Sequence, residues 1–167
     1  MKPKVGFYGL DLYSLYTSIE MVLGYLDKVD PEAAHRARYR YSCFEHFAED
    51  PQAYGYASSF GLSKPCQNEV VEQLVELRQK AQAYMQMDGR IAADEYFYVE
   101  QNARLIKNAE EYYREMFANG TNSWNRRDRH MVETLTALID YINSQVGRAK
   151  IVLWEHNSHL AMPAPPR

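Results

Sequence analysis

Residues 97–116, FYVEQNARLIKNAEEYYREM, set the class of the fold. Side chains suited to packing recur there every three or four positions, the spacing that brings them to one face of an α-helix. Asn119-Gly120 follows this stretch and supplies a helix stop. The stretch therefore predicts a long amphipathic helix, whose buried stripe is Phe97, Gln101, Leu105, Ala109, Tyr112 and Met116.

The same helical period extends through most of the chain, and start and stop signals divide it. Asp30-Pro31-Glu32 combines an N-cap, a proline in the first turn and an acidic residue, and Gly147 supplies a stop. The predicted helices are residues 15–26, 31–48, 70–85, 97–116 and 131–146, with a short segment after Asp50-Pro51 that Gly55 and Gly61 break up.

Two short apolar runs near the ends of the chain differ from this helical pattern. Val5-Gly6-Phe7-Tyr8-Gly9-Leu10 and Ile151-Val152-Leu153-Trp154 show no alternation, which is typical of strands buried on both faces. We therefore predict strands at residues 5–11 and 150–155. Because two strands alone are marginally stable in water, they need further neighbours in a larger sheet.

These elements predict a mainly α chain with two short β-strands, forming the large helical insertion of an α/β, three-layer fold. Residues 1–160 are expected to form a single helical domain flanked by the two strands, as a fragment of a larger α/β protein. The proline-rich residues 161–167 are expected to form an extended tail.

Composition narrows the class of protein. With 167 residues, 46% of them hydrophobic, the chain can bury one core, and its net charge of −3 gives no general attraction to nucleic acid or an anionic membrane. No run approaches the ~18 apolar residues of a membrane span, and Asp11 interrupts the apolar start, unlike a secretory signal. We expect a cytoplasmic protein that binds neither nucleic acid nor membrane, with Cys43 and Cys66 as buried free thiols.

The densest cluster of reactive side chains follows the second predicted strand. Ligands of open α/β sheets bind at the carboxyl ends of strands, so His156 and His159 are placed for general acid–base work near neutral pH. A capping or packing role is the alternative for His156. The His-x-x-His spacing also suits a metal, but no third ligand lies at ligand spacing beside it, so we predict no metal and no cofactor.

Two other segments carry candidate groups. Asp11 ends the first predicted strand, where it orients an imidazole or, alternatively, caps the helix that begins near Ser14. Residues 123–131, SWNRRDRHM, open the last predicted helix, and polar groups at a helix N-terminus can hold an anion or a developing oxyanion. The alternative there is a Ser123 cap followed by a solvated basic patch. Phosphate-binding loops and the common serine and zinc hydrolase motifs are absent.

Four blocks of this sequence together resemble the erythromycin esterase family. They are residues 6–14 (GFYGLDLYS), 100–103 (EQNA), 123–131 (SWNRRDRHM) and 154–159 (WEHNSH), and they occur in the family's order. The resemblance implies an α/β sheet with large helical insertions and a cleft in which a histidine activates water to open a macrolactone ester, without an obligatory metal. The family's paired histidines match His156 and His159, and its Asn-x-Arg-Asp block matches Asn125, Arg127 and Asp128.

The chain departs from the family pattern at two places. The family's early Gly-Glu-x-x-His motif is absent, and Glu155 stands where the family usually has a small residue. We therefore expect part of an esterase-like hydrolase, incomplete or inactive alone, that acts on a small-molecule (macro)lactone or other carboxylic ester. The alternative is a non-catalytic helical binding or assembly module that self-associates. The expected catalytic residues are His156, His159, Arg127 and Asp128, and the expected substrate-binding residues are Asp11, Trp124 and Asn125.

Overall fold

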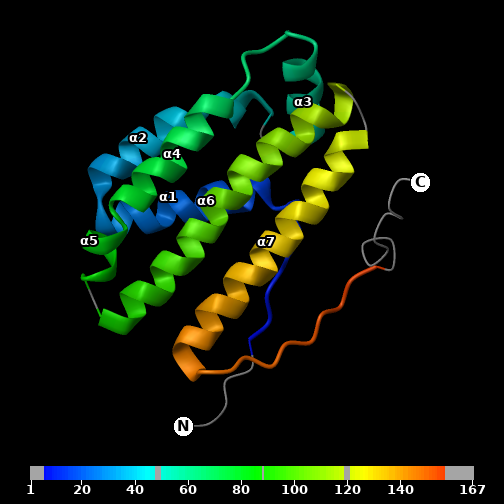
Figure 1. Cartoon of the computed structure of the whole chain (residues 1–167). Helices are drawn as coiled ribbons and strands as arrows, with labels where there is room; N and C mark the ends of the chain where they lie inside the picture. Colours follow the sequence, from blue (N-terminus) through cyan, green and yellow to red (C-terminus); the bar gives the residue numbers. More distant parts are fainter. Residues whose placement is uncertain (1–5, 48–49, 88, 119–120, 157–167) are drawn as a thin grey trace.

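The computed structural model of this chain describes residues 6–47, 50–87, 89–118 and 121–156, with the side chains of 89–92 and 121–122 left aside. Over these ranges the chain is a bundle of α-helices (Figure 1). No helix in the described ranges has the length and apolar character needed to cross a membrane. The elements are α1 (Leu15–Val29), α2 (Pro31–Tyr41), the 3-10 helix η1 (Ser42–Phe47), α3 (Pro51–Ser59), α4 (Gln67–Gln79), α5 (Ala81–Met85), α6 (Gly89–Ala118) and α7 (Thr121–Val146).

The two predicted strands are wrong for the residues that the structure describes. Residues 6–14 and 149–156 run as irregular segments outside the helices, and no β-strand occurs among the described residues. Phe7, Val152 and Trp154 each have more than nine-tenths of their surface exposed. A strand needs a neighbouring backbone to pair with, and the described helices offer none. The mainly helical prediction is confirmed, whereas the α/β sheet around it stays a prediction.

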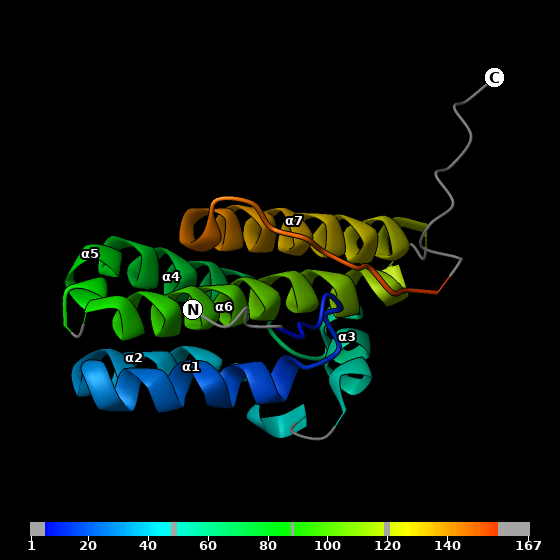
Figure 2. The same cartoon turned by 90° about the horizontal axis from the view of Figure 1, so that it is seen from below.

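Helix α6 forms the axis of the bundle. It packs against α1, α3, α4, α5 and α7, and Figure 2 shows it between α1 on one side and α7 on the other. Neighbours on several sides widen its buried face beyond a single stripe. The predicted stripe therefore contains only two of the buried residues that α6 has among the described side chains, Ala109 and Tyr112. The other buried residues of α6 are Tyr96, Val99, Ala103, Ile106, Glu110 and Tyr113.

Local signals placed several helix ends correctly. The Asp30 carboxylate accepts a hydrogen bond from Ala33 N (3.0 Å) at the start of α2, and Asp50 does the same for the second and third residues of α3. Gly147 has φ +81° directly after α7, a conformation that favours glycine. The helix predicted at 31–48 changes to a 3-10 helix at Ser42, and the one predicted at 70–85 begins earlier and divides at Lys80.

Gly55 does not break a helix, contrary to the prediction. It lies buried within α3, where a Cβ atom would stand 2.2 Å from the carbonyl oxygen of Tyr113 on α6. The missing side chain therefore lets α3 approach the backbone of α6 closely. Glycine at this position therefore reflects close helix packing and not the end of a helix.

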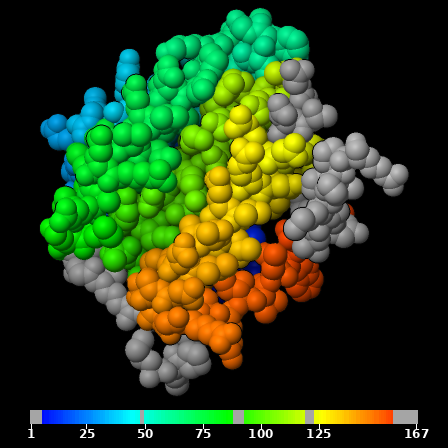
Figure 3. All heavy atoms as spheres, viewed as in Figure 1, coloured from blue at the N-terminus to red at the C-terminus, as the bar shows by residue number. Residues whose placement is uncertain are grey.

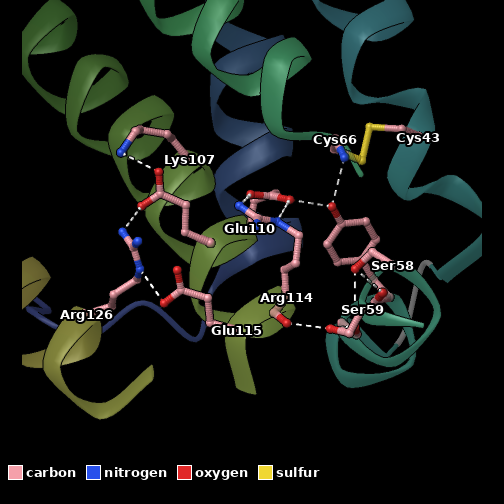
Figure 4. Close-up of polar contacts among 12 residues, drawn as sticks. Cys43, Ser58, Ser59, Cys66, Lys107, Glu110, Arg114, Glu115 and Arg126 are labelled. Atoms are coloured by element: carbon pink, nitrogen blue, oxygen red, sulfur yellow. Dashed lines mark hydrogen bonds and ion pairs between the residues drawn. A yellow bond between two sulfur atoms is a disulfide. The ribbon is translucent and has the colours of Figure 1, made fainter. Parts of the chain in front are cut away.

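Cys43 and Cys66 form a disulfide, so the prediction of free thiols is wrong. Their Cα atoms are 5.9 Å apart although 23 positions separate them in the sequence. The Cys66 amide donates to the Tyr54 hydroxyl (2.9 Å), which brings the start of α4 beside α3 (Figure 4). Disulfides persist in oxidising compartments, so this bond lends no support to the cytoplasmic location predicted above.

Carboxylates of α6 bind side chains of the helices on either side of it. Glu110 has no exposed surface, and its carboxylate accepts hydrogen bonds from Tyr54 Oη (2.7 Å) and Arg114 Nε (3.0 Å). The Arg114 cation compensates a carboxylate that would be costly to bury alone. On the α7 side, the Arg126 guanidinium binds Glu111 and Glu115 of α6 (Figure 4).

Candidate functional site

A groove of about 480 Å³ lies between the N-terminal segment and helices α6 and α7. Figure 3 shows part of that segment as a blue patch between α7 and the C-terminal segment. Apolar walls with a few converging polar groups are typical of small-molecule sites. The apolar lining is Phe7, Tyr8, Phe97, Tyr98, Leu105 and Leu138, and the polar lining is Asp11, Ser14, Gln101, Asn102, His130 and Thr134.

Helical spacing places these residues on the groove. On α7, His130, Thr134 and Leu138 follow one another at intervals of four and so lie on one face. On α6, Gln101 and Leu105 have the same interval. The Gln101 side-chain oxygen is buried without a hydrogen-bond partner among the described residues. Because an unpaired buried acceptor is costly, a donor on a bound molecule would stabilise it.

His130 is a buried, neutral imidazole in the wall of the groove. It is 2% exposed, and burial, aided by the charge of Arg104, lowers its pKa to about 4. Its Nδ1 lies 2.9 Å from Asn108 Nδ2. The Asn108 oxygen faces Lys107 Nζ (3.3 Å), so the amide turns its NH₂ group, a donor, toward the ring. Nδ1 therefore accepts, and the ring proton resides on Nε2.

Thr134 connects His130 to a cation on α6. Its Oγ1 accepts a hydrogen bond from Arg104 Nη2 (3.2 Å) and lies 3.5 Å from His130 Nε2. Arg104 is largely enclosed, and burial lowers its pKa. Side chains of α6 and α7 thus form a continuous polar row from Lys107 through Asn108, His130 and Thr134 to Arg104. Of these residues, His130 and Thr134 line the groove.

Asp11 and Arg127 join the N-terminal segment to α7. Arg127 donates from Nε to Oδ1 (2.9 Å) and from Nη2 to Oδ2 (2.6 Å) of Asp11, which raises the Arg127 pKa. The guanidinium carbon lies 4.5 Å from the centre of the Tyr13 ring and 5.9 Å from that of Trp124. The capping alternative for Asp11 is wrong, because the N-cap of α1 is Ser14.

The structure brings together only part of the predicted site. Asp11 lines the groove, Arg127 binds Asp11, and Trp124 lies beside the Arg127 guanidinium. Asn125 is exposed and Asp128 half-buried on α7, and neither is among the groove residues. His156 is exposed on the C-terminal segment and also outside the groove lining, whereas His159 lies outside the described residues. Within the described ranges, no cluster of three His, Cys, Asp or Glu side chains could hold a metal.

Sequence reasoning missed the polar row. His130 lay within residues 123–131 without a role of its own, and Asn108 and Thr134 were not singled out. A usable signal was present, because Arg104 and Asn108 on α6, like His130 and Thr134 on α7, are polar pairs four residues apart. The contact between the two pairs depends on how α6 packs against α7, which neither pair indicates by itself.

Comparison with known families assigns the class of this protein. Residues 1–165 match the family described as erythromycin esterase. The chain therefore belongs to the erythromycin esterase family, which confirms the resemblance drawn from its four sequence blocks and supports a hydrolase-like role. No solved structure matches the chain.

Proposed function

We propose that this chain supplies the substrate groove and part of the catalytic machinery of a hydrolase that opens a (macro)lactone or another carboxylic ester. Family membership supports the hydrolase class. The observation that supports an ester as the substrate is the groove itself, where apolar and aromatic walls lie beside a few polar groups and the imidazole in the lining, His130, is neutral.

Ester hydrolysis requires an activated water and a donor to the oxygen that gains charge. His130 is not available as the base, because its Nδ1 accepts from Asn108 and its Nε2 carries the proton. The groups proposed to activate water are therefore His156 and His159, as the family resemblance implies, although His156 does not line the groove. Asp128 is proposed to orient one of these imidazoles.

Arg127 is proposed to stabilise the developing oxyanion. Its pair with Asp11 uses Nε and Nη2, which leaves Nη1 as the donor for a substrate oxygen. The same pair holds Asp11 against the groove, and Asp11, Trp124 and Asn125 are proposed to bind the substrate, the last two from outside the groove lining. Tyr13 and Trp124 limit the positions that the guanidinium can adopt.

Hydrolysis of erythromycin A and 4-nitrophenyl butyrate by the purified chain tests this proposal. We expect His156→Ala to lower kcat at least ~100-fold, the usual contribution of a general base. His35→Ala is the matched control, because His35 is exposed on α2, which packs against α1 and α4. Equal rates for the His156→Ala variant and the wild type would contradict the role of His156. A wild-type rate no higher than that of buffer would contradict hydrolase activity of this chain by itself.

A second candidate function is assembly through the two exposed terminal segments. Phe7, Val152 and Trp154 present apolar surface to solvent without cover from the described helices. Absence of hydrolysis, together with a dimer in sedimentation velocity that Val152→Asp dissociates, would favour this function over the hydrolase.

A further inference from the structure

Besides the Gln101 oxygen, the hydroxyl of Thr134 is a group at the groove whose hydrogen-bonding capacity is incompletely used among the described residues. Thr134 is 9% exposed, and the surface it retains faces the groove. A hydroxyl can accept two hydrogen bonds and donate one. Among the described residues, two groups approach its oxygen, Arg104 Nη2 at 3.2 Å and His130 Nε2 at 3.5 Å.

Both of these neighbours present hydrogens to Thr134. A guanidinium only donates, and the ring proton of His130 resides on Nε2 because Nδ1 faces the NH₂ group of Asn108. The Thr134 oxygen therefore meets two donors, and its own hydrogen has no acceptor in either neighbour.

The helix backbone does not take up this hydrogen either. Threonine in a helix commonly donates to the carbonyl four residues earlier, as Thr136 does to Val132 O (2.8 Å) two positions further along α7. Thr134 makes no such bond within the described part of the chain, where its contacts are with Arg104 and His130. The hydrogen is left for an acceptor in the groove.

We propose that Thr134 donates this hydrogen bond to the carbonyl oxygen of the ester bound in the groove, with Arg104 and His130 as positioning residues. The inference rests on the proposed function for the identity of the ligand. The Arg104 cation beside the hydroxyl favours an oxygen that is partly or fully negative and disfavours a cationic ligand. A carbonyl oxygen that gains charge during hydrolysis meets this requirement.

Two variants of Thr134 distinguish the effect of the hydroxyl donor from the effect of side-chain shape. Thr134→Val keeps the shape and removes the donor, whereas Thr134→Ser keeps the donor. We expect kcat/KM for erythromycin A to fall ~100-fold or more in Thr134→Val, the usual cost of losing one such donor, and to stay within ~5-fold in Thr134→Ser. Thr136→Val is the control on the same helix and leaves kcat/KM unchanged. Equal values for the Thr134→Val variant and the wild type overturn the proposal and leave the hydrolase intact.

Binding of a ketone decides the inference even if the chain hydrolyses no ester. Cyclododecanone presents a carbonyl oxygen and cannot be hydrolysed, so its affinity is measured by NMR titration. We expect Kd to rise at least ~10-fold in Thr134→Val and little in Thr134→Ser. Absence of binding at the groove, or equal affinity in the wild type and Thr134→Val, overturns the donor role whatever the outcome for hydrolysis.

The tautomer of His130 provides a check on the unmodified chain, independent of any variant's folding. Imidazole ¹⁵N shifts are expected to show Nδ1 without a proton and Nε2 with one at pH 7. Protonation of Nδ1 would make His130 Nε2 the acceptor for Thr134, and it would overturn the proposal.

Discussion

Burial at single positions sets which charges this protein carries near neutral pH. Asp30, beside Lys80, and Glu76, beside Arg36 and Arg40, hold pKa values of about 2, so both stay ionised in mild acid. His130 behaves in the opposite way, because burial favours its neutral form and lowers its pKa to about 4. The stabilising contributions of the carboxylates and of His130 are lost over different pH ranges. The two contributions can therefore be measured separately.

We expect the free energy of unfolding to fall by about 2 kcal/mol between pH 6.5 and pH 5 because of His130. In this window the unfolded chain binds a proton at His130, whose pKa there is 6.5, while the native chain does not. Stability therefore rises with pH across it. Urea unfolding of the wild type and His130→Gln, measured at pH 6.5 and pH 5, gives the contribution as the difference between their slopes.

The matched control for this titration is His35→Gln, which removes an exposed imidazole from α2. It should keep the wild-type slope. The Asp30 and Glu76 carboxylates lose their contributions to the free energy of unfolding mainly below pH 4.5. Their pKa values are 3.8 and 4.5 in the unfolded chain and about 2 in the native chain, so the two states bind different numbers of protons only in this range. A slope that survives in His130→Gln would show that His130 is already charged in the native chain at pH 5.

Two helical glycines, Gly55 and Gly24, differ in whether helix packing requires them. Gly55 lies where α3 meets the backbone of α6, and a Cβ atom there would overlap the Tyr113 carbonyl group. Gly24 lies on the exposed side of α1, with nothing within 4 Å of its Cβ position. The same substitution should therefore have opposite effects at the two sites.

Gly55→Ala is expected to destabilise the chain by about 3 kcal/mol, the upper part of the range for overpacking, because the clash is with backbone. Gly24→Ala is expected to stabilise it by about 0.5–1 kcal/mol, since alanine loses less conformational freedom in a helix. Thermal unfolding followed by circular dichroism measures both changes. A stabilised Gly55→Ala variant would mean that α3 does not approach α6 as described.

Helix ends were predictable from sequence because their chemistry is local. Asp30 and Asp50 satisfy amide groups two or three residues away, and Gly147 needs only its own backbone angles. The absence of strands among the described residues was not predictable, because a strand exists only through a partner, and that partner can lie anywhere in the chain. The polar row from His130 to Arg104 was not predictable for the same reason, because its residues meet only when α6 and α7 pack together. The family blocks, by contrast, identified Arg127 as a candidate site residue.

At the scale of the whole molecule, the disulfide closes a loop that runs from η1 through α3 to Cys66, the N-cap of α4. Cys43 and Cys66 enclose Tyr54, whose hydroxyl binds both Glu110 and the Cys66 amide. Cross-linking reduces the conformational freedom of the unfolded chain, more so for longer loops. The bond should stabilise the bundle without touching the groove.

Reduction of the disulfide is expected to lower the free energy of unfolding by about 3 kcal/mol, the value for a loop of this length. Guanidinium unfolding of the wild type, with and without a phosphine reductant, measures the change. The double variant Cys43→Ala/Cys66→Ala is the control, and the reductant should not affect it. An identical midpoint for the oxidised and reduced wild type would indicate that the two cysteines are not joined in solution.

The position of α6 at the axis has a consequence for the order in which the chain assembles during synthesis. Helices α1, α3 and α4 all pack against α6, which begins only at Gly89. Translation proceeds at ~5–20 residues per second, so the first helices wait several seconds for the surface that covers them. Until α6 has emerged from the ribosome, the apolar faces of α1, α3 and α4 lack the helix that covers them and are open to chaperones.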